Sequence, residues 1–141
     1  MKAERARLAR LHRLERVRAI AKQTAAAEAA QAEGTLAQLE ALAERTRQMA
    51  AEYSPRPGIQ DGGRLRQLSN FARGLEGISA NTASDAANAR RIADIKMQAL
   101  SQAERRRAVV EERAERQARV IAKGSEAPVL GGRRKFGTGL E

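Results

Sequence analysis

The chain has 141 residues, a formal net charge of +10, no cysteine or tryptophan, and three aromatic residues. A core of large side chains is not expected, because 30 of its hydrophobic residues are alanine. Disulfides and thiolate metal sites are excluded, and no apolar run approaches the roughly 20 residues that cross a bilayer. With 31% charged residues, this composition is typical of a long helix or coiled coil. We expect a cytoplasmic protein that is not conventionally secreted, since no apolar signal-peptide core follows Met1.

The first predicted helix covers residues 3–53. Its apolar and small residues recur in steps of three and four, which places them in one stripe and favours packing against a partner helix. The predicted stripe comprises Leu8, Leu11, Leu14, Val17, Ile20 or Ala21, Thr24, Ala27, Leu36, Leu39, Leu42, Met49 and Tyr53.

A loop over residues 54–63 is predicted to separate this helix from the second. It contains Pro55 and Pro57, and proline removes a backbone donor and clashes with the preceding turn, so a helix must stop here. The second helix is predicted over residues 64–123. Its stripe comprises Leu65, Leu68, Phe71 or Ala72, Leu75, Ile78, Thr82, Ala86, Ala89, Ile92, Met97, Leu100, Ala103, Val110, Ala114, Gln117 and Ile121.

These elements predict an all-α fold over residues 1–123. Two helices of this length that are joined by about ten residues must run antiparallel with their stripes facing. The expected fold is therefore an antiparallel two-helix coiled-coil hairpin. In the predicted register Leu8 lies near Val110, and Tyr53 lies near Leu65.

Charge is distributed unevenly along the chain. Residues 1–22 carry a net charge of +6, residues 104–141 carry +4, and residues 23–103 carry none. A hairpin would bring the two basic segments together. Residues 124–141 are rich in glycine and are predicted to form a flexible basic tail, disordered until a partner binds.

No pattern of residues indicates catalysis. His12 is the single histidine, and its place on an arginine-rich helical turn indicates a surface residue. The carboxylates are scattered at surface spacing, and a two-helix hairpin has no interior volume for a pocket. We therefore expect no enzyme activity, no metal and no cofactor.

Two features indicate recognition of other molecules. Arginines recur in both terminal helical segments while the leucine spacing continues among them, which favours a protein with an acidic surface over nucleic acid; a solvated cationic face without a partner is the alternative. The second feature is Phe71 with Leu75, which are four residues apart and share a helix face. Their spacing favours packing between the helices, and the alternative is an exposed contact for another protein.

The sequence Asn-Phe-Ala-Arg-Gly-Leu-Glu-Gly-Ile over residues 70–78 carries a resemblance to a known family. Together with the Leu/Arg-rich first helix, Tyr53 near its end and the Arg/Glu-rich second helix, it resembles the FliJ family of bacterial flagellar protein export. A looser likeness is to the stalk proteins of type III secretion. The most specific element is Phe71 followed by Leu75 and Glu76, whereas Gly74 and Gly77 depart from the family's pattern.

The resemblance implies an antiparallel coiled coil similar to the central stalk of rotary ATPases. It implies binding to the flagellar export ATPase, to the export gate protein FlhA and to export chaperones, at the cytoplasmic face of the inner membrane through these partners only. Phe71 and Leu75 would contact the gate. Contact with the ATPase is expected, mainly from charge and geometry, at Arg5, Arg10, Arg13, Arg106 and Arg113.

Two other functions remain as alternatives. The basic hairpin could bind nucleic acid, or the chain could be a self-associating structural coiled coil. We expect no nucleic-acid partner, because the arginine-rich helical segments over residues 1–22 and 104–123 contain no phenylalanine, tyrosine or tryptophan on which bases could stack.

Overall fold

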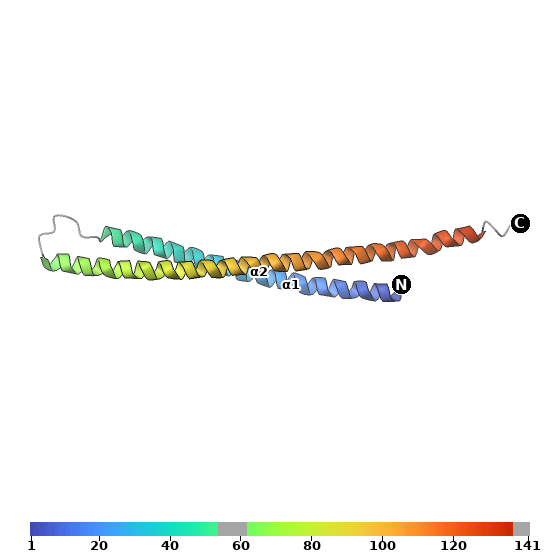
Figure 1. Cartoon of the computed structure of the whole chain (residues 1–141), viewed down its shortest axis with the longest axis horizontal. Helices are drawn as coiled ribbons and strands as arrows, with labels where there is room; N and C mark the ends of the chain where they lie inside the picture. Colours follow the sequence, from blue (N-terminus) through green and yellow to red (C-terminus); the bar gives the residue numbers. More distant parts are fainter. Residues whose placement is uncertain (54–61, 137–141) are drawn as a thin grey trace. The chain divides into compact units, whose positions relative to one another are not determined.

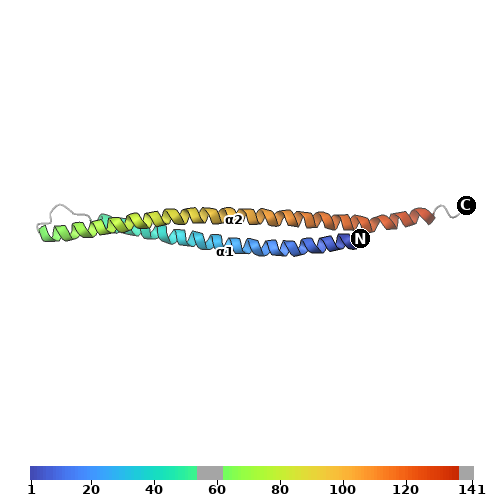
Figure 2. The same ribbon diagram turned by 60° about the horizontal axis from the view of Figure 1, so that its bottom comes forward.

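A computed structural model describes residues 1–53 and 62–136, and the side chains of residues 1–53 and 62–125. Apart from Met1 and Tyr53, all of these residues lie in two helices, α1 (Lys2–Glu52) and α2 (Gly62–Phe136). The helices pack against each other as an antiparallel pair, which confirms the predicted hairpin (Figure 1, Figure 2). Within the described ranges, neither helix is long and apolar enough to span a membrane.

The helix boundaries differ from the prediction mainly at the end of α2. Helix α1 matches its predicted range to within one residue at each end, and α2 begins two residues early. Beyond the predicted end at Lys123, α2 runs on to Phe136 and includes Gly124, Pro128, Gly131 and Gly132, although glycine and proline disfavour a helix interior. Residues 54–61 of the predicted loop and 137–141 of the predicted tail lie outside the described residues, so flexibility of the tail stays a prediction.

The chain divides into two compact units, and each contains one stretch of both helices. Unit 1 comprises residues 1–25 and 100–141, and unit 2 comprises residues 26–99. Within unit 2, Glu28 pairs with Lys96 and Glu40 pairs with Arg90. Numbers rise along α1 as they fall along α2, so the two stretches run antiparallel.

Most buried and half-buried positions of both helices follow one another in steps of three and four; Ala19, Ala26, Ser69 and Ser101 are half-buried beside this series. This seven-residue repeat keeps one face of each helix against its partner, as in a coiled coil. We call these positions the inward positions. On α1 they are Glu4, Leu8, Leu11, Glu15, Arg18, Lys22, Ala25, Ala29, Ala32, Leu36, Leu39, Ala43, Thr46 and Ala50; on α2 they are Leu68, Ala72, Leu75, Ser79, Thr82, Ala86, Ala89, Ala93, Lys96, Leu100, Ala103, Arg107, Val110, Ala114, Gln117, Ile121 and Gly124.

The predicted stripe on α1 is wrong at positions in both halves, and Leu42, Met49 and Tyr53 of its second half are exposed. Leu14, Val17 and Ile20 are exposed, and Arg18 and Lys22 take inward positions instead. Successive steps of three residues fall short of a full helical turn, so the apolar series that begins at Leu8 rotates away from α2. Apolar character alone therefore does not predict which face of α1 packs against α2.

Small residues fill the interhelical face of unit 2. No described side chain is both large and fully buried, and Ala29 is the most buried residue. The larger residues Ile78, Ile92 and Met97, which the sequence placed in the α2 stripe, are exposed. They lie beside the inward positions rather than in them.

The register also differs from the prediction. Val110 lines a groove with Leu14 rather than with Leu8, and the Tyr53 ring packs edge-on against Phe71 rather than near Leu65. Both differences amount to six residues along one helix. The predicted register assumed that residues equally far from the middle of the loop lie side by side. In a coiled coil, side-chain packing between the two helices sets the register instead.

Alanine substitution at the helical glycines should stabilise the fold. A Cβ atom at Gly74 or Gly77 would meet no atom within 4 Å, so close helix approach does not explain these glycines. We expect Gly74→Ala to raise the free energy of unfolding by about 0.5–1 kcal/mol, because alanine loses less backbone entropy on folding. Urea denaturation followed by circular dichroism measures this change. The reverse substitution Ala80→Gly, at an exposed site on α2, should lower stability equally, and destabilisation by Gly74→Ala would contradict a helical backbone there.

Candidate protein-binding site

Unit 1 contains an open groove between α1 and α2. Its volume is about 280 Å³, and its walls combine apolar and cationic side chains from both helices. The lining residues are Leu14, Arg18, Arg105, Arg106, Val109, Val110 and Arg113.

A second groove of about 380 Å³ adjoins the first and shares Arg113 with it. We call the two together the arginine groove. The second part is lined by Arg7, Leu11, Arg113, Arg116, Gln117 and Val120.

The seven-residue repeat explains how these side chains come to one side of unit 1. On α2, Arg106 and Arg113 are two turns apart, and each immediately precedes an inward position. On α1, Arg7 and Leu14 precede inward positions in the same way. Residues that flank the inward positions on the same edge of two antiparallel helices lie across from one another.

The positive charge of the groove is largely uncompensated. Arg116 pairs with Glu112 at 2.6 Å, but within the described part of the chain no ion pair is formed by Arg18, Arg106 or Arg113. The Nε atom of Arg18 is buried without a hydrogen-bond partner, and so is that of Arg107. An unsatisfied buried donor of this kind costs about 1–3 kcal/mol. A carboxylate from another molecule could pair with the guanidinium groups of Arg106 and Arg113, which line the groove.

The structure brings together some, but not all, of the arginines predicted to contact an ATPase. Arg106 and Arg113 both line the arginine groove. Arg5, Arg10 and Arg13 are exposed but do not line it.

Arg10 and Arg13 belong to a different face of α1. They precede the exposed residues Val17 and Ile20 at steps of three and four, which places all four on one outward stripe. The Nε atom of Arg13 donates a hydrogen bond to the carbonyl oxygen of Ala9 at 3.4 Å. The predicted set therefore divides between a groove and an outward stripe.

Sequence reasoning missed several lining residues of the groove. Arg18 and Arg105 were not among the residues predicted to contact the ATPase, and Leu14 was placed against α2. The strict alternation of four and three residues, continued from Leu8 and Leu11, would have placed Arg18 at an inward position.

The two residues predicted to contact the export gate do not share an exposed surface. Phe71 is 50% exposed, whereas Leu75 is 8% exposed and occupies an inward position. Residues four apart differ by about 40° around a helix, so one can face the partner helix while the other flanks it. The Phe71 ring contacts Tyr53 edge-on, with centroids 5.1 Å apart, and both line an open groove in unit 2.

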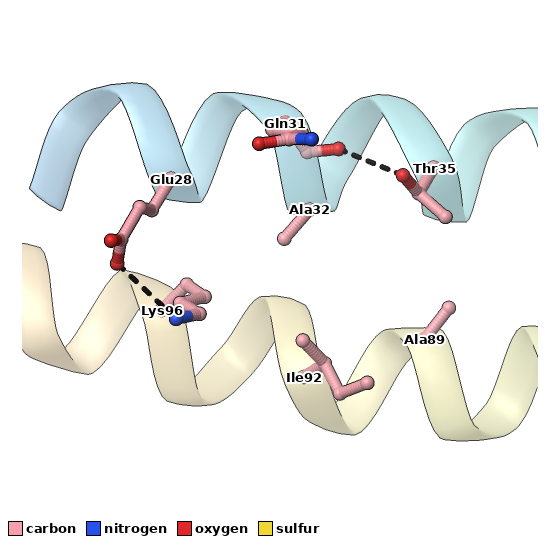
Figure 3. A pocket seen from close by; sticks show the side chains of 7 residues that line it. All are labelled: Glu28, Gln31, Ala32, Thr35, Ala89, Ile92 and Lys96. Carbon is pink, nitrogen blue, oxygen red and sulfur yellow. Dashed lines mark hydrogen bonds and ion pairs between the residues drawn. The ribbon is translucent and has the colours of Figure 1, made fainter. Parts of the chain in front are cut away.

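A further groove of about 380 Å³ in unit 2 lies beside small residues (Figure 3). Ala32 of α1 faces Ile92 of α2 there, and Lys96 Nζ lies 3.2 Å from Glu28 Oε2 across the groove. The lining holds no arrangement of acid, base and nucleophile. Residues 1–53 and 62–136 contain no cluster of three potential metal ligands, and His12 is exposed.

Comparison with known proteins identifies no relative: no family model, no curated protein and no solved structure matches the chain. The function must therefore be argued from the residues themselves.

Removal of the Arg18 guanidinium should stabilise the isolated chain. Its buried Nε has no partner, so Arg18→Leu is expected to raise the free energy of unfolding by about 1 kcal/mol in urea denaturation. The matched control is Arg13→Leu, at an exposed position on the same helix, for which a change below about 0.5 kcal/mol is expected. If Arg18→Leu lowered stability more than Arg13→Leu, the Arg18 guanidinium would have to form hydrogen bonds within the chain, which would contradict this prediction.

Proposed function

We propose that this chain is a non-catalytic stalk of the bacterial flagellar type III export apparatus, which binds the export ATPase through the arginine groove. The observation that carries the proposal is the uncompensated charge of Arg18, Arg106 and Arg113 in a groove with apolar walls. The resemblance of residues 70–78 to the FliJ family supplies the identity of the apparatus. The escort of export chaperones and a location at the cytoplasmic face of the inner membrane belong to the same proposal.

The arginine groove suits an acidic amphipathic segment of a protein. Apolar side chains of the partner would cover Leu14 and Val109, which removes apolar surface from water. Its carboxylates would pair with guanidinium groups that find no ion-pair partner among the described residues. Such pairs also steer and orient the encounter.

The chain would act as a stalk if it bound the assembled ATPase ring and the free ATPase subunits with different affinities. A ligand shifts an equilibrium only by the difference between its affinities for the two states. If an assembled ATPase ring presents its acidic segments together and free subunits do not, the arginine groove favours the assembled ring. No catalytic residue of this chain is needed for that effect.

The export gate protein FlhA is the proposed partner of Phe71. A half-exposed aromatic ring held edge-on by Tyr53 is a suitable hydrophobic contact for another protein. Leu75 supports this contact from the interhelical face rather than touching the gate. The proposal therefore keeps Phe71 as the contact residue and gives Leu75 a packing role.

Protein is favoured over nucleic acid as the partner of the groove. Leu11, Leu14 and Val120 line it, and unit 1 offers no aromatic side chain among its described residues for base stacking. Tight duplex binding that falls with salt, without any protein partner, would favour the nucleic-acid alternative.

Charge reversal in the groove should abolish the ATPase interaction. We expect Arg106→Glu with Arg113→Glu to weaken binding to the export ATPase at least tenfold, about 1.4 kcal/mol, and to remove the chain's effect on the rate of ATP hydrolysis. The control, Arg119→Glu with Lys123→Glu, makes the same charge change on α2 outside the groove, and a loss below about threefold is expected. Failure of the unmodified chain to bind the ATPase or to change its hydrolysis rate would refute the proposal.

Substitutions at Phe71 and Leu75 should separate binding from stability. Phe71→Ala is expected to reduce binding to purified FlhA at least tenfold, while the free energy of unfolding falls by less than about 1 kcal/mol. Leu75→Ala should lower the free energy of unfolding by about 2–3 kcal/mol, because a buried leucine is removed. Isothermal titration and urea denaturation measure the two quantities. Unchanged FlhA binding by a folded Phe71→Ala variant would contradict the assignment.

A further inference from the structure

The charge that α1 exposes in unit 1 has a single sign. Within residues 1–25 the two acidic residues, Glu4 and Glu15, take inward positions, whereas most of the basic residues are exposed. The first exposed acidic residue of α1 is Glu28, which belongs to unit 2 and pairs there with Lys96. The exposed basic residues of this stretch are Lys2, Arg5, Arg7, Arg10, Arg13 and Arg16.

These basic side chains have no anionic partner within the described part of the chain. Lys2 and the exposed arginines of residues 1–25 form no ion pair with a described carboxylate. Helix α2 packs against the inward positions of α1, so the opposite face of α1 points away from it. A row of like charges on one exposed face attracts an extended anionic surface, because such a surface can meet all of them at once.

Two large apolar residues lie among the arginines on that opposite face. We call Arg10, Arg13, Val17 and Ile20 the outward stripe. Val17 is 60% exposed, and Ile20, at 63%, is the most exposed large apolar residue among those described. No residue of the outward stripe lines the arginine groove. Arginines that alternate with exposed apolar side chains are typical of a helix that lies on a membrane surface.

An anionic phospholipid bilayer fits the outward stripe better than the other anionic macromolecules. Nucleic acid offers phosphates to Arg10 and Arg13, but it offers no apolar phase to Val17 and Ile20. An acidic protein would need a concave surface that matches the convex face of a single helix. A bilayer offers headgroup phosphates and acyl chains together at one surface, and its lipids adapt to the shape of the helix.

We propose that the outward stripe binds the surface of an anionic phospholipid bilayer, with the first turns of α1 parallel to that surface. Arg10 and Arg13 contact headgroup phosphates, while Val17 and Ile20 enter the boundary between headgroups and acyl chains. Electrostatic attraction supplies most of the affinity, because two apolar side chains bury little area. This contact goes beyond the proposed function, in which the chain reaches the membrane through its partners only, and it does not depend on that function.

Co-sedimentation of the full chain with lipid vesicles tests the proposal. The chain should bind vesicles that mix phosphatidylglycerol with phosphatidylcholine, bind them less as salt is raised, and not bind phosphatidylcholine alone. No ATPase or FlhA is present in this experiment, so its failure would leave the proposed export function standing. A chain that ignores both kinds of vesicle, or that binds both equally, would overturn the proposal.

A pair of charge variants shows whether the outward stripe makes the contact. We expect Arg10→Gln with Arg13→Gln to lower the partition coefficient on the mixed vesicles at least tenfold, about the effect of two cations near the surface. The matched control is Arg66→Gln with Arg73→Gln, which removes the same charge from exposed positions of α2 in unit 2. A loss below about threefold is expected for the control. Equal losses would mean that binding follows net charge rather than the outward stripe.

The apolar residues of the outward stripe separate lipid from nucleic acid. Val17→Gln with Ile20→Gln keeps the net charge and should lower the partition coefficient on the mixed vesicles at least about threefold, because apolar area no longer leaves water. Glutamine is a good helix former, and circular dichroism checks that helix content is retained. If duplex DNA binding fell in the Arg10→Gln, Arg13→Gln variant while vesicle binding did not, the stripe would belong to nucleic acid and the proposal would fail.

A fluorophore on the outward stripe gives an independent test. The chain has no cysteine, so Ile20→Cys introduces a unique thiol for an environment-sensitive dye. Its emission should move to shorter wavelength when the mixed vesicles are added. The same dye at Ile78→Cys, an exposed isoleucine of unit 2, should show no such shift. Equal shifts at the two positions would contradict contact through the outward stripe.

Discussion

Alanine, serine or threonine holds most inward positions of unit 2, and this limits how the two helices can pack. Small side chains bury little apolar area, so the hairpin gains less from its interhelical face than a leucine-rich coiled coil would. In the described part of unit 2, no isoleucine, methionine or phenylalanine occupies an inward position. These larger residues flank the inward positions, where they remain exposed. The binding surfaces that we propose for the ATPase and for FlhA therefore lie along the edges of the helix pair.

Unit 1 places several charged residues at inward positions, whereas Lys96 is the one such residue among the described inward positions of unit 2. Arg18 and Lys22 on α1 and Arg107 on α2 replace the alanines found in unit 2. A hairpin selected only for stability would avoid two buried Nε atoms without partners. Local rules of this kind are commonly broken where a protein binds something else. Arg18 contributes both to the arginine groove and to the cost of an unsatisfied buried donor in the free chain.

The sequence alone was sufficient for the fold class but not for the site. Pro55 and Pro57 placed the break between the helices, and the length of each helix required an antiparallel pair. The inward face of α1 could not be predicted from apolar residues, because Leu14, Val17 and Ile20 carry the hydrophobic signal while Arg18 faces α2. Register was misplaced by six residues because the loop constrains it weakly. Because the register was wrong, the sequence did not show which arginines line the arginine groove together.

The register of the helix pair is the central claim, and distances between paired spin labels test it most directly. Because the chain has no cysteine, labels can be attached at Glu28→Cys with Lys96→Cys and, separately, at Glu28→Cys with Arg90→Cys. The observed ion pairs predict the shorter distance for residues 28 and 96, since Arg90 lies beside Glu40, about 18 Å further along α1. A shorter distance between residues 28 and 90 would contradict the account, because it would restore the register expected from the loop.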